Sequence, residues 1–158
     1  MVDKNQAVID YMLTCPQLAN NPTFFNCVQA KDNNKEIVTI ANDRLVNRPY
    51  IDGSVLRRYS YTIIDFRSVT FNPLVDALGY SNENVDDMLD VQGIIDWIRE
   101  QNDIYNYPDF GEDCLVDEIV TTSDIPSLNG VDNSLSPALA KYSITVNINY
   151  LDNSKRLF

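Results

Sequence analysis

Histidine is absent from this 158-residue chain. Its absence removes the most common general base and the most common protein metal ligand at neutral pH. Every Ser-His or Cys-His catalytic arrangement is excluded with it. Glycine is scarce as well: the five glycines are not spaced as a P-loop or a dinucleotide-binding turn requires. The remaining function classes either use carboxylates alone or need no bond-making chemistry.

Cysteine is also rare. Cys15, Cys27 and Cys114 are far apart and odd in number, so they predict neither a disulfide framework nor a zinc cluster, and they suit synthesis in a reducing cytoplasm. No run of 18 apolar residues occurs, and the first residues lack a basic segment followed by an apolar one. The sequence therefore predicts neither a secretion signal nor a membrane-spanning helix.

Basic residues are the minority, with 12 Lys and Arg against 23 Asp and Glu and a net charge of −11. This balance argues against binding to duplex DNA, which needs cations at the phosphates, and against docking on anionic membranes. A negative surface does suit a channel through which DNA slides without binding. Hydrophobic residues make up 44% of the chain, enough for one domain spanning residues 1–158.

Hydrophobic periodicity predicts two main helices. In residues 3–15 the apolar positions recur at helical spacing, with Asp3 as the N-cap and Gln6 completing a capping box. Residues 85–102 give the clearest helix, with Asn84 as the cap and Asp86 and Asp87 in the first turn. The apolar stripes are Val8, Tyr11, Met12 and Cys15 in the first helix, and Val91, Ile94, Ile95 and Ile98 in the second.

The remaining segments predict strands and loops. We expect a β-hairpin at 23–41, turning at Asp32-Asn33-Asn34, and strands at 55–67, 114–122 and 139–151, the last alternating cleanly between apolar and polar residues. We expect loops at 42–54, at 68–84 with a short helical turn at 73–78, and at 123–137. This order predicts an α+β fold, a single mostly antiparallel β-sheet packed against two main α-helices.

Carboxylate clusters are the only candidates for chemistry. The groups Asp109, Glu112 and Asp113, or Asp117 and Glu118, contain the acids that a glycosidase needs, although an acidic protein places many acids close together in any case. Asp86, Asp87 and Asp90 offer oxygens to a cation, but the calcium-loop pattern is missing and helix capping explains the first two. We predict no catalytic residue, no cofactor and no metal site.

A basic and aromatic cluster is the main candidate for an interface. It consists of Arg57, Arg58, Tyr59 and Tyr61, residue types that are enriched where proteins meet. The alternative is that the two arginines balance acids on opposite faces of their strand. In the 123–137 loop, Asp124, Ile125, Pro126 and Leu128 complete the predicted subunit or partner interface.

Five segments follow one another in a familiar order: Ile64-Asp65-Phe66-Arg67 ending a strand, the helix Ile94-Ile95-Asp96-Trp97-Ile98-Arg99-Glu100-Gln101-Asn102, a loop with Pro108 and Phe110, a strand with Val116, Ile119 and Val120, and the final strand from Ala140 to Tyr150. Together they cover roughly residues 55–152. In these segments the chain resembles the minor capsid or tail-terminator proteins of long-tailed phages that infect Gram-positive bacteria.

The resemblance implies a structural virion protein without enzymatic activity. Such subunits form hexameric rings that cap the head-proximal end of the tail tube, stop its polymerisation and join it to the neck or connector. The implied partners are further copies of the chain, the tail-tube protein and the neck protein. DNA would pass through the lumen without specific binding, and assembly would occur in the host cytoplasm. The alternatives are a neighbouring neck or head–tail completion protein, a carboxylate-dependent phage hydrolase, and an acidic inhibitor or DNA mimic.

Overall fold

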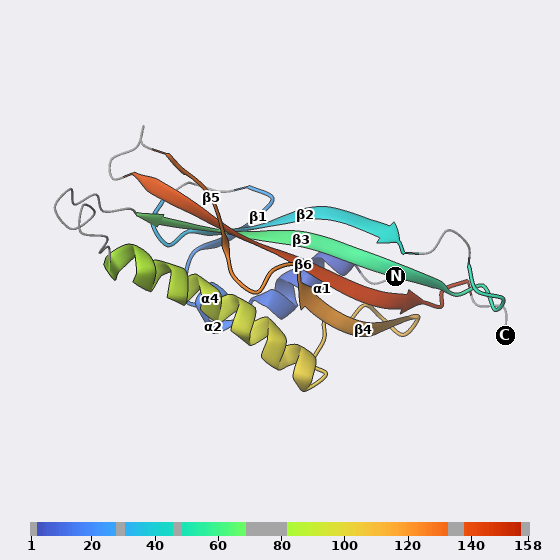
Figure 1. Cartoon of the computed structure of the whole chain (residues 1–158). Helices are drawn as coiled ribbons and strands as arrows, with labels where there is room; N and C mark the ends of the chain where they lie inside the picture. Colours follow the sequence, from blue (N-terminus) through green and yellow to red (C-terminus); the bar gives the residue numbers. More distant parts are fainter. Residues whose placement is uncertain (1–2, 28–30, 46–48, 69–81, 133–137, 156–158) are drawn as a thin grey trace.

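A single sheet with helices on one face organises the structure. The computed structural model describes residues 3–27, 31–45, 49–68, 82–132 and 138–155. Figure 1 shows the helices of the described residues on the same side of the sheet. The helices are α1 (Lys4–Met12), α2 (Pro16–Ala19) and α4 (Asn82–Asp103), and the strands are β1 (Thr23–Phe25), β2 (Lys35–Arg44), β3 (Val55–Ser68), β4 (Cys114–Thr121), β5 (Ser127–Asp132) and β6 (Leu139–Asp152).

The strand order is β1-β2-β3-β6-β4, with β5 also paired to β6. β3 and β6 are antiparallel along their whole length, from Val55 opposite Asp152 to Ser68 opposite Leu139. On the other side of β6, β4 pairs with its second half and β5 with its first half. The predicted α+β class with a mostly antiparallel sheet is confirmed, since the β1–β2 pair alone is parallel among the described strands.

The core lies between the helices and one face of the sheet. Alternate residues of β6 are buried, as the sequence alternation predicts. The apolar stripes of α1 and α4 pack on them. The core residues of these three elements are Val8, Tyr11 and Met12, then Val91, Ile94, Ile95 and Ile98, then Ala140, Tyr142, Ile144, Val146, Ile148 and Tyr150.

Asp3 caps α1 as predicted, because its Oδ1 accepts hydrogen bonds from the backbone N–H groups of Asn5 at 2.9 Å and Gln6 at 3.4 Å. The side chain of Gln6 instead donates to Asp10 at 2.8 Å, one turn along the helix. The cap therefore forms, while the Gln6 amide strengthens an i, i+4 contact on the exposed face.

The hairpin expected at 23–41 is wrong, because β1 runs parallel to β2. The asparagines decide this. Asn26 has a positive φ of 55° that ends β1, and its side chain accepts the Thr39 N–H at 3.0 Å. Asn33, with φ 65°, donates its N–H to the Phe66 carbonyl at 2.7 Å. The turn therefore faces β3, and β2 enters beside β1 in the same direction. The loop expected from residue 42 also begins later, because β2 continues to Arg44.

Two further expectations are corrected. The 123–137 loop contains β5, which pairs with β6 through its backbone while every one of its side chains is exposed. Because β5 buries neither face, its sequence lacks the alternation of apolar and polar residues that would predict a strand. Helix α4 begins at Asn82, so Asn84 lies inside it and Asp86 and Asp87 fall beyond its first turn. The helical turn expected at 73–78 lies outside the described residues.

The buried tyrosines predict how the protein responds to alkali. Burial raises the pKa of Tyr150 to about 12 and also raises the pKa of Tyr59 and Tyr61. Because these phenols ionise near ~10 in the unfolded chain, the stability they contribute is complete below that pH. It is lost as the pH rises through the folded-state pKa values.

We therefore expect much of the tyrosinate absorbance to appear only as the far-ultraviolet circular dichroism is lost above pH ~10. A full tyrosinate signal in a protein that keeps its circular dichroism would contradict this burial. The Tyr150→Phe variant serves as the control, because it should lower the late part of the signal by one tyrosine.

Candidate interaction surfaces

On the sheet face opposite the helices, side chains of neighbouring strands form hydrogen bonds with one another. Arg58 donates from Nε to the Asn149 Oδ1 at 2.9 Å, and the Asn149 Nδ2 donates to the Glu118 Oε1 at 2.6 Å. One step along the strands, the Ser60 hydroxyl donates to the Asn147 Oδ1 at 2.7 Å. These bonds cross β3, β6 and β4 in rows, because directly opposed residues lie on the same face.

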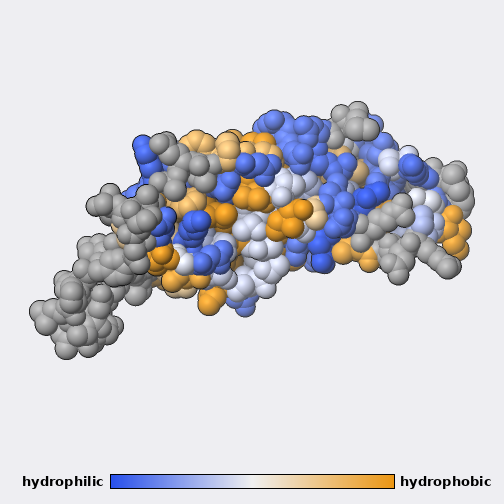
Figure 2. Space-filling model, turned by 90° about the horizontal axis from the view of Figure 1, so that it is seen from above, coloured by the Kyte–Doolittle hydropathy of each residue, from blue (hydrophilic) through white to orange (hydrophobic). Residues whose placement is uncertain are grey.

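This open face needs no partner to satisfy its polar groups. Thr62 and Thr145 continue the rows at 3.3 Å, and the Asn129 Nδ2 donates to the Ser143 hydroxyl at 2.8 Å. Figure 2 views the molecule from above and shows a pale band of intermediate hydropathy between orange and blue areas. The rows thus combine hydrogen-bonded hydroxyl and amide side chains with one cation, Arg58, and one anion, Glu118.

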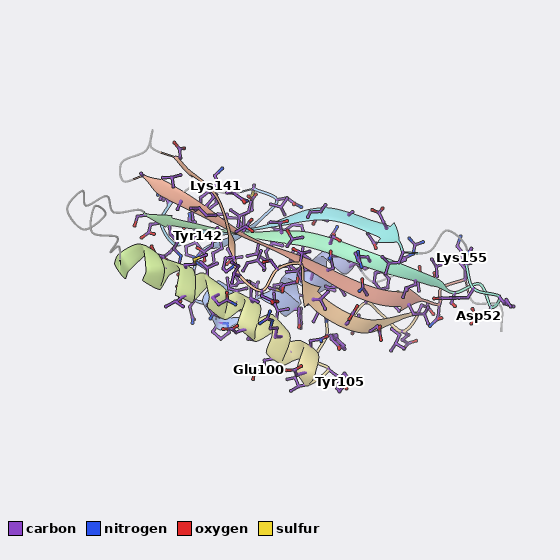
Figure 3. The ribbon with its side chains drawn as sticks, in the orientation of Figure 1. Asp52, Glu100, Tyr105, Lys141, Tyr142 and Lys155 are labelled. Atoms are coloured by element: carbon purple, nitrogen blue, oxygen red, sulfur yellow. The ribbon has the colours of Figure 1, made fainter. Side chains whose placement is uncertain are left out.

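At one end of the open face, leucines replace the polar rows. Leu56, Leu151 and Leu115 lie directly opposite one another on β3, β6 and β4, and Leu115 is 65% exposed. Figure 3 places Asp52 and Lys155 at this end of the molecule and Lys141 and Tyr142 in its other half. The leucine row is thus an apolar area at one tip of a long sheet.

The two lateral edges of the sheet are open in the part of the chain that the structure describes. β1 pairs only with Lys35–Ile37, so residues 38–44 of β2 have no described strand on their outer side. On the opposite edge, no described strand lies outside β5. Each open edge is interrupted by a β-bulge, one at Ile40 and one at Asn129. Bulges of this kind hinder pairing with a foreign strand.

Both edges nevertheless expose aliphatic side chains. Ile40 on β2 is 56% exposed and Leu128 on β5 is 55% exposed. Ile125, just before β5, and Val131 within it are exposed as well. The β2 edge thus exposes a single aliphatic side chain, whereas three lie within residues 125–131 of the opposite edge.

The predicted interface residues fall into four places. Tyr59 and Tyr61 lie in the core, where the Tyr59 hydroxyl donates to the Asn5 Oδ1 at 2.5 Å and the Tyr61 hydroxyl contacts the Met12 sulfur at 3.0 Å. They offer no surface to a partner. Arg57 points to the helix side and pairs with Asp152 at 3.0 Å, as the alternative interpretation of the arginine pair describes. Arg58 lies on the open sheet face, bonded to Asn149.

Asp124, Ile125, Pro126 and Leu128 do come together, in the segment that leads from β4 into β5. The Asp124 carbonyl accepts from the Gln92 Nε2 at 2.9 Å, and its carboxylate forms an ion pair with Arg99, so the segment is fastened to α4. Pro126 is buried, while Ile125 and Leu128 remain exposed. Leu89, one turn before Gln92 on α4, is also exposed, at 64%. The sequence argument did not single out this exposed leucine.

Charge is distributed unevenly between the two edges. Residues 82–132, which form α4, β4 and β5, contain fourteen acidic residues and one basic residue, a net charge of −13. Residues 31–68, which include β2 and β3, contain seven basic and five acidic residues, a net charge of +2. The acidity of the protein thus belongs to one side of the sheet.

A buried ionic cluster fixes α4 against the sheet. Lys35 and Asp65 are fully buried and 3.1 Å apart, and Arg67 donates to the same carboxylate from Nε at 2.9 Å. Arg67 also reaches Asp90 on α4 at 2.6 Å, with Asp87 at 3.9 Å. Burial lowers the pKa of Lys35 and raises the pKa of Asp87. Two of the acids that the sequence offered to a cation, Asp87 and Asp90, therefore face the guanidinium of Arg67.

The polar residues at the end of α4 also have structural roles. The Asn102 Oδ1 accepts the Ile119 N–H of β4 at 3.1 Å and the Tyr107 hydroxyl at 3.0 Å. The Gln101 Oε1 accepts from the Asn106 Nδ2 at 2.6 Å. Arg67 and Asn102 therefore fasten α4 to β3 and to β4, while Gln101 holds the turn that follows the helix.

The acids proposed for hydrolysis lie on the surface. Asp109, Glu112, Asp113 and Asp117 are exposed, while Glu118 is half-buried and bound to Asn149. Asp109 lines an open hollow of about 480 Å³ beside α1, together with Asp3 and Asp10. Each of these three carboxylates already accepts a structural hydrogen bond, Asp109 from the Gly111 N–H at 2.9 Å. No group of acids or cysteines suited to a metal ion occurs in the described ranges.

No protein-family model matches this chain, and a comparison with curated proteins finds no significant match. None of the helices in the described residues has the length and apolar character to cross a bilayer.

Proposed function

We propose that this protein is a ring-forming subunit of a phage tail, which caps the head-proximal end of the tail tube, ends its polymerisation and joins it to the neck or connector. The observation that carries the proposal is the one-sided sheet with aliphatic side chains exposed on both lateral edges, in a chain whose second half resembles tail terminators. A subunit with two different contact surfaces on opposite sides is what a closed ring of identical copies requires.

The resembling segments support the proposal through their positions in the fold. Ile64-Asp65-Phe66-Arg67 ends β3, the helical segment lies in α4, and the last two segments are β4 and β6. They meet through the ionic cluster and the Asn102 contacts. The resemblance therefore concerns residues that specify how the helix sits on the sheet, and it supports a shared architecture and assembly role.

The charge distribution supports a role around DNA without binding it. The open sheet face has neutral polar rows, and the −13 of residues 82–132 would repel phosphates wherever it faces a channel. Each copy brings the same excess, so a ring multiplies it. Such a lumen would let DNA pass without holding it.

A length assay tests the proposal. The purified protein is mixed, at rising substoichiometric amounts, with the tail-tube protein from the same phage genome, and tube length is measured by negative-stain electron microscopy. We expect tubes to become shorter and to carry a single ring of this protein at one end. Tubes of unchanged length, with the protein still monomeric in native mass spectrometry, would exclude a terminator. Binding to the connector protein alone would indicate the neighbouring neck position.

A further inference from the structure

A row of leucines crosses the open sheet face at one tip of the molecule, where Figure 1 shows the start of β3 beside the end of β6. Leu56 on β3, Leu151 on β6 and Leu115 on β4 lie directly opposite one another, and Leu115 is 65% exposed. Leu45, which is 37% exposed, adjoins this row, because its N–H donates to the Leu56 carbonyl at 2.8 Å. The turn before β3 exposes Ile51 at 93%. An apolar area of this kind is typical of a surface that another chain covers.

The row next to the leucines has a charge at each end. Arg58 on β3 and Glu118 on β4 both lie opposite Asn149 on β6. The Arg58 Nε and the Glu118 Oε1 bind Asn149, so the terminal guanidinium nitrogens and the Glu118 Oε2 keep no partner among the described residues. Asp43 lies opposite Arg58 on β2, without an ion pair between these two described side chains. One half-buried cation and one half-buried anion therefore flank β6, each able to take a further partner.

The two rows are arranged symmetrically about β6. Each row has its middle residue on β6 and one residue on either side, on β3 and on β4. A second copy can be laid on this face by a two-fold axis that runs parallel to β6. The leucine of β3, Leu56, then faces Leu115 of the other copy. In the same way Arg58 faces Glu118 of the other copy. A surface that matches itself in this way is what a two-fold contact between identical chains requires.

Charge also favours a second copy as the occupant of this face. The chain has a net charge of −11, so two copies repel each other over most of their surfaces. The two rows contain one cation and one anion, and across the proposed axis unlike charges face each other. The next rows are small side chains that are hydrogen-bonded within the sheet, such as Ser60 with Asn147. A second sheet can therefore approach without leaving these polar groups unpaired.

We propose that two copies of this chain pair face to face through the leucine row, with Arg58 of each copy bound to Glu118 of the other. The leucines form the apolar centre of the contact, and the two ion pairs fix its orientation. Packing of two sheets with roughly aligned strands is a common arrangement. The contact leaves both lateral edges of the sheet uncovered, so this inference does not depend on the proposed ring.

A charge-exchange experiment tests the pairing. Arg58→Glu and Glu118→Arg are made separately, and each protein is studied by native mass spectrometry and sedimentation velocity without tail-tube protein. We expect the unchanged protein to form dimers. Each variant should raise the dissociation constant at least about tenfold, because like charges then face each other twice. An equal mixture of the two variants should form dimers again, with one copy of each, because the acids of the first then face the arginines of the second.

Glu100→Arg is the control for the charge variants. Glu100 is exposed on α4, away from the open face, so this variant should keep the dimer of the unchanged protein. Circular dichroism confirms the fold of each variant. Rising salt should weaken the dimer, because the ion pairs that orient it are partly exposed.

Truncation tests the leucine row itself. Leu115→Ala removes a side chain that is 65% exposed, so the fold should be unaffected. The dissociation constant should nevertheless rise at least about tenfold, because each dimer contains the side chain twice. Leu89→Ala is the matched control, since Leu89 is 64% exposed on α4 and lies outside the row. It should leave the dimer unchanged.

The outcomes separate this inference from the proposed function. A protein that stays monomeric across the concentration series would overturn the pair, whether or not rings form with the tube protein. If Leu115→Ala then weakened binding to the tube protein, the row would belong to that partner. A dimer unaffected by Leu115→Ala and by both charge variants would also overturn the proposal. So would a mixture of the charge variants that stays monomeric. A dimer that behaves as expected, beside tail tubes of unchanged length, would support the pair and overturn the terminator.

Discussion

Replacing Asp65 with alanine is expected to lower the free energy of unfolding by about 3–5 kcal/mol, the largest effect of any single substitution considered for this protein. Lys35 would be left in the core without its carboxylate, 0% exposed, and Arg67 would lose its bidentate partner. For a chain of this length the melting temperature should fall by roughly 6–20 °C. Chemical denaturation followed by circular dichroism measures the change.

A second substitution tests whether the unpaired charge of Lys35 causes the loss of stability. Adding Lys35→Met to the Asp65→Ala variant should recover part of the loss, because Arg67 keeps Asp90 as a partner while the deeper charge is removed. Asp124→Ala is the control. It also breaks an ion pair, with Arg99, but both groups are well exposed and the expected cost is about 0–1 kcal/mol. An Asp65→Ala protein as stable as the Asp124→Ala protein would contradict this account of the cluster.

Truncating Ile95 on α4 to alanine is expected to destabilise the protein by about 2–5 kcal/mol, because the side chain is fully buried between the helix and the sheet. Leu89→Ala, on the same helix, removes an aliphatic side chain that is 64% exposed and should change stability by less than about 0.5 kcal/mol. The two variants share helix and chemistry, so burial is the difference between them. Equal losses in thermal unfolding would contradict the placement of the helix.

In assembly we expect the opposite order, with a larger effect for Leu89→Ala than for Ile95→Ala. Leu89 is exposed on α4, one turn before the Gln92 that binds Asp124, and its removal is expected to affect contacts with other chains more than the fold. Native mass spectrometry of the two proteins in the presence of the tube protein measures this difference. Ring formation that is unaffected in Leu89→Ala would limit the interface to the edge residues themselves.

The elements with one buried face could be predicted from the sequence. In β6 the even positions are buried and the odd ones face the open side, so alternation showed the strand and its orientation directly. Helices α1 and α4 likewise bury one stripe each, and their spacing was sufficient. In these elements the apolar positions of the sequence are the positions that the structure buries, so the hydrophobic pattern predicts them directly.

Elements whose placement depends on distant partners could not be predicted. β5 buries no side chain and is a strand only because β6 offers it backbone partners. The direction of β1 is decided by Asn26 binding Thr39 and by Asn33 binding Phe66, contacts that no local pattern contains. In the same way, the sequence gives no sign that Asp65, Arg67 and Asp90 form ion pairs with one another in the structure.

The interface itself stays a prediction, and the structure shows only which of its residues are exposed. Ile125 and Leu128 were correctly placed in an exposed segment, because a loop-like sequence keeps such residues near solvent. Tyr59 and Tyr61 were assigned to the same interface from residue type, yet they face the core because they share the buried side of β3 with Ile63. Strand alternation gives the side of a residue, but a sequence does not say which side the helices cover.

Cryo-electron microscopy of the intact phage neck tests the central claim most directly, with the protein identified by its density or by a fused label. We predict one ring of this chain between the last ring of the tail tube and the connector. A neck and tail in which that position is filled by another protein, with this chain absent from the particle, would contradict the account.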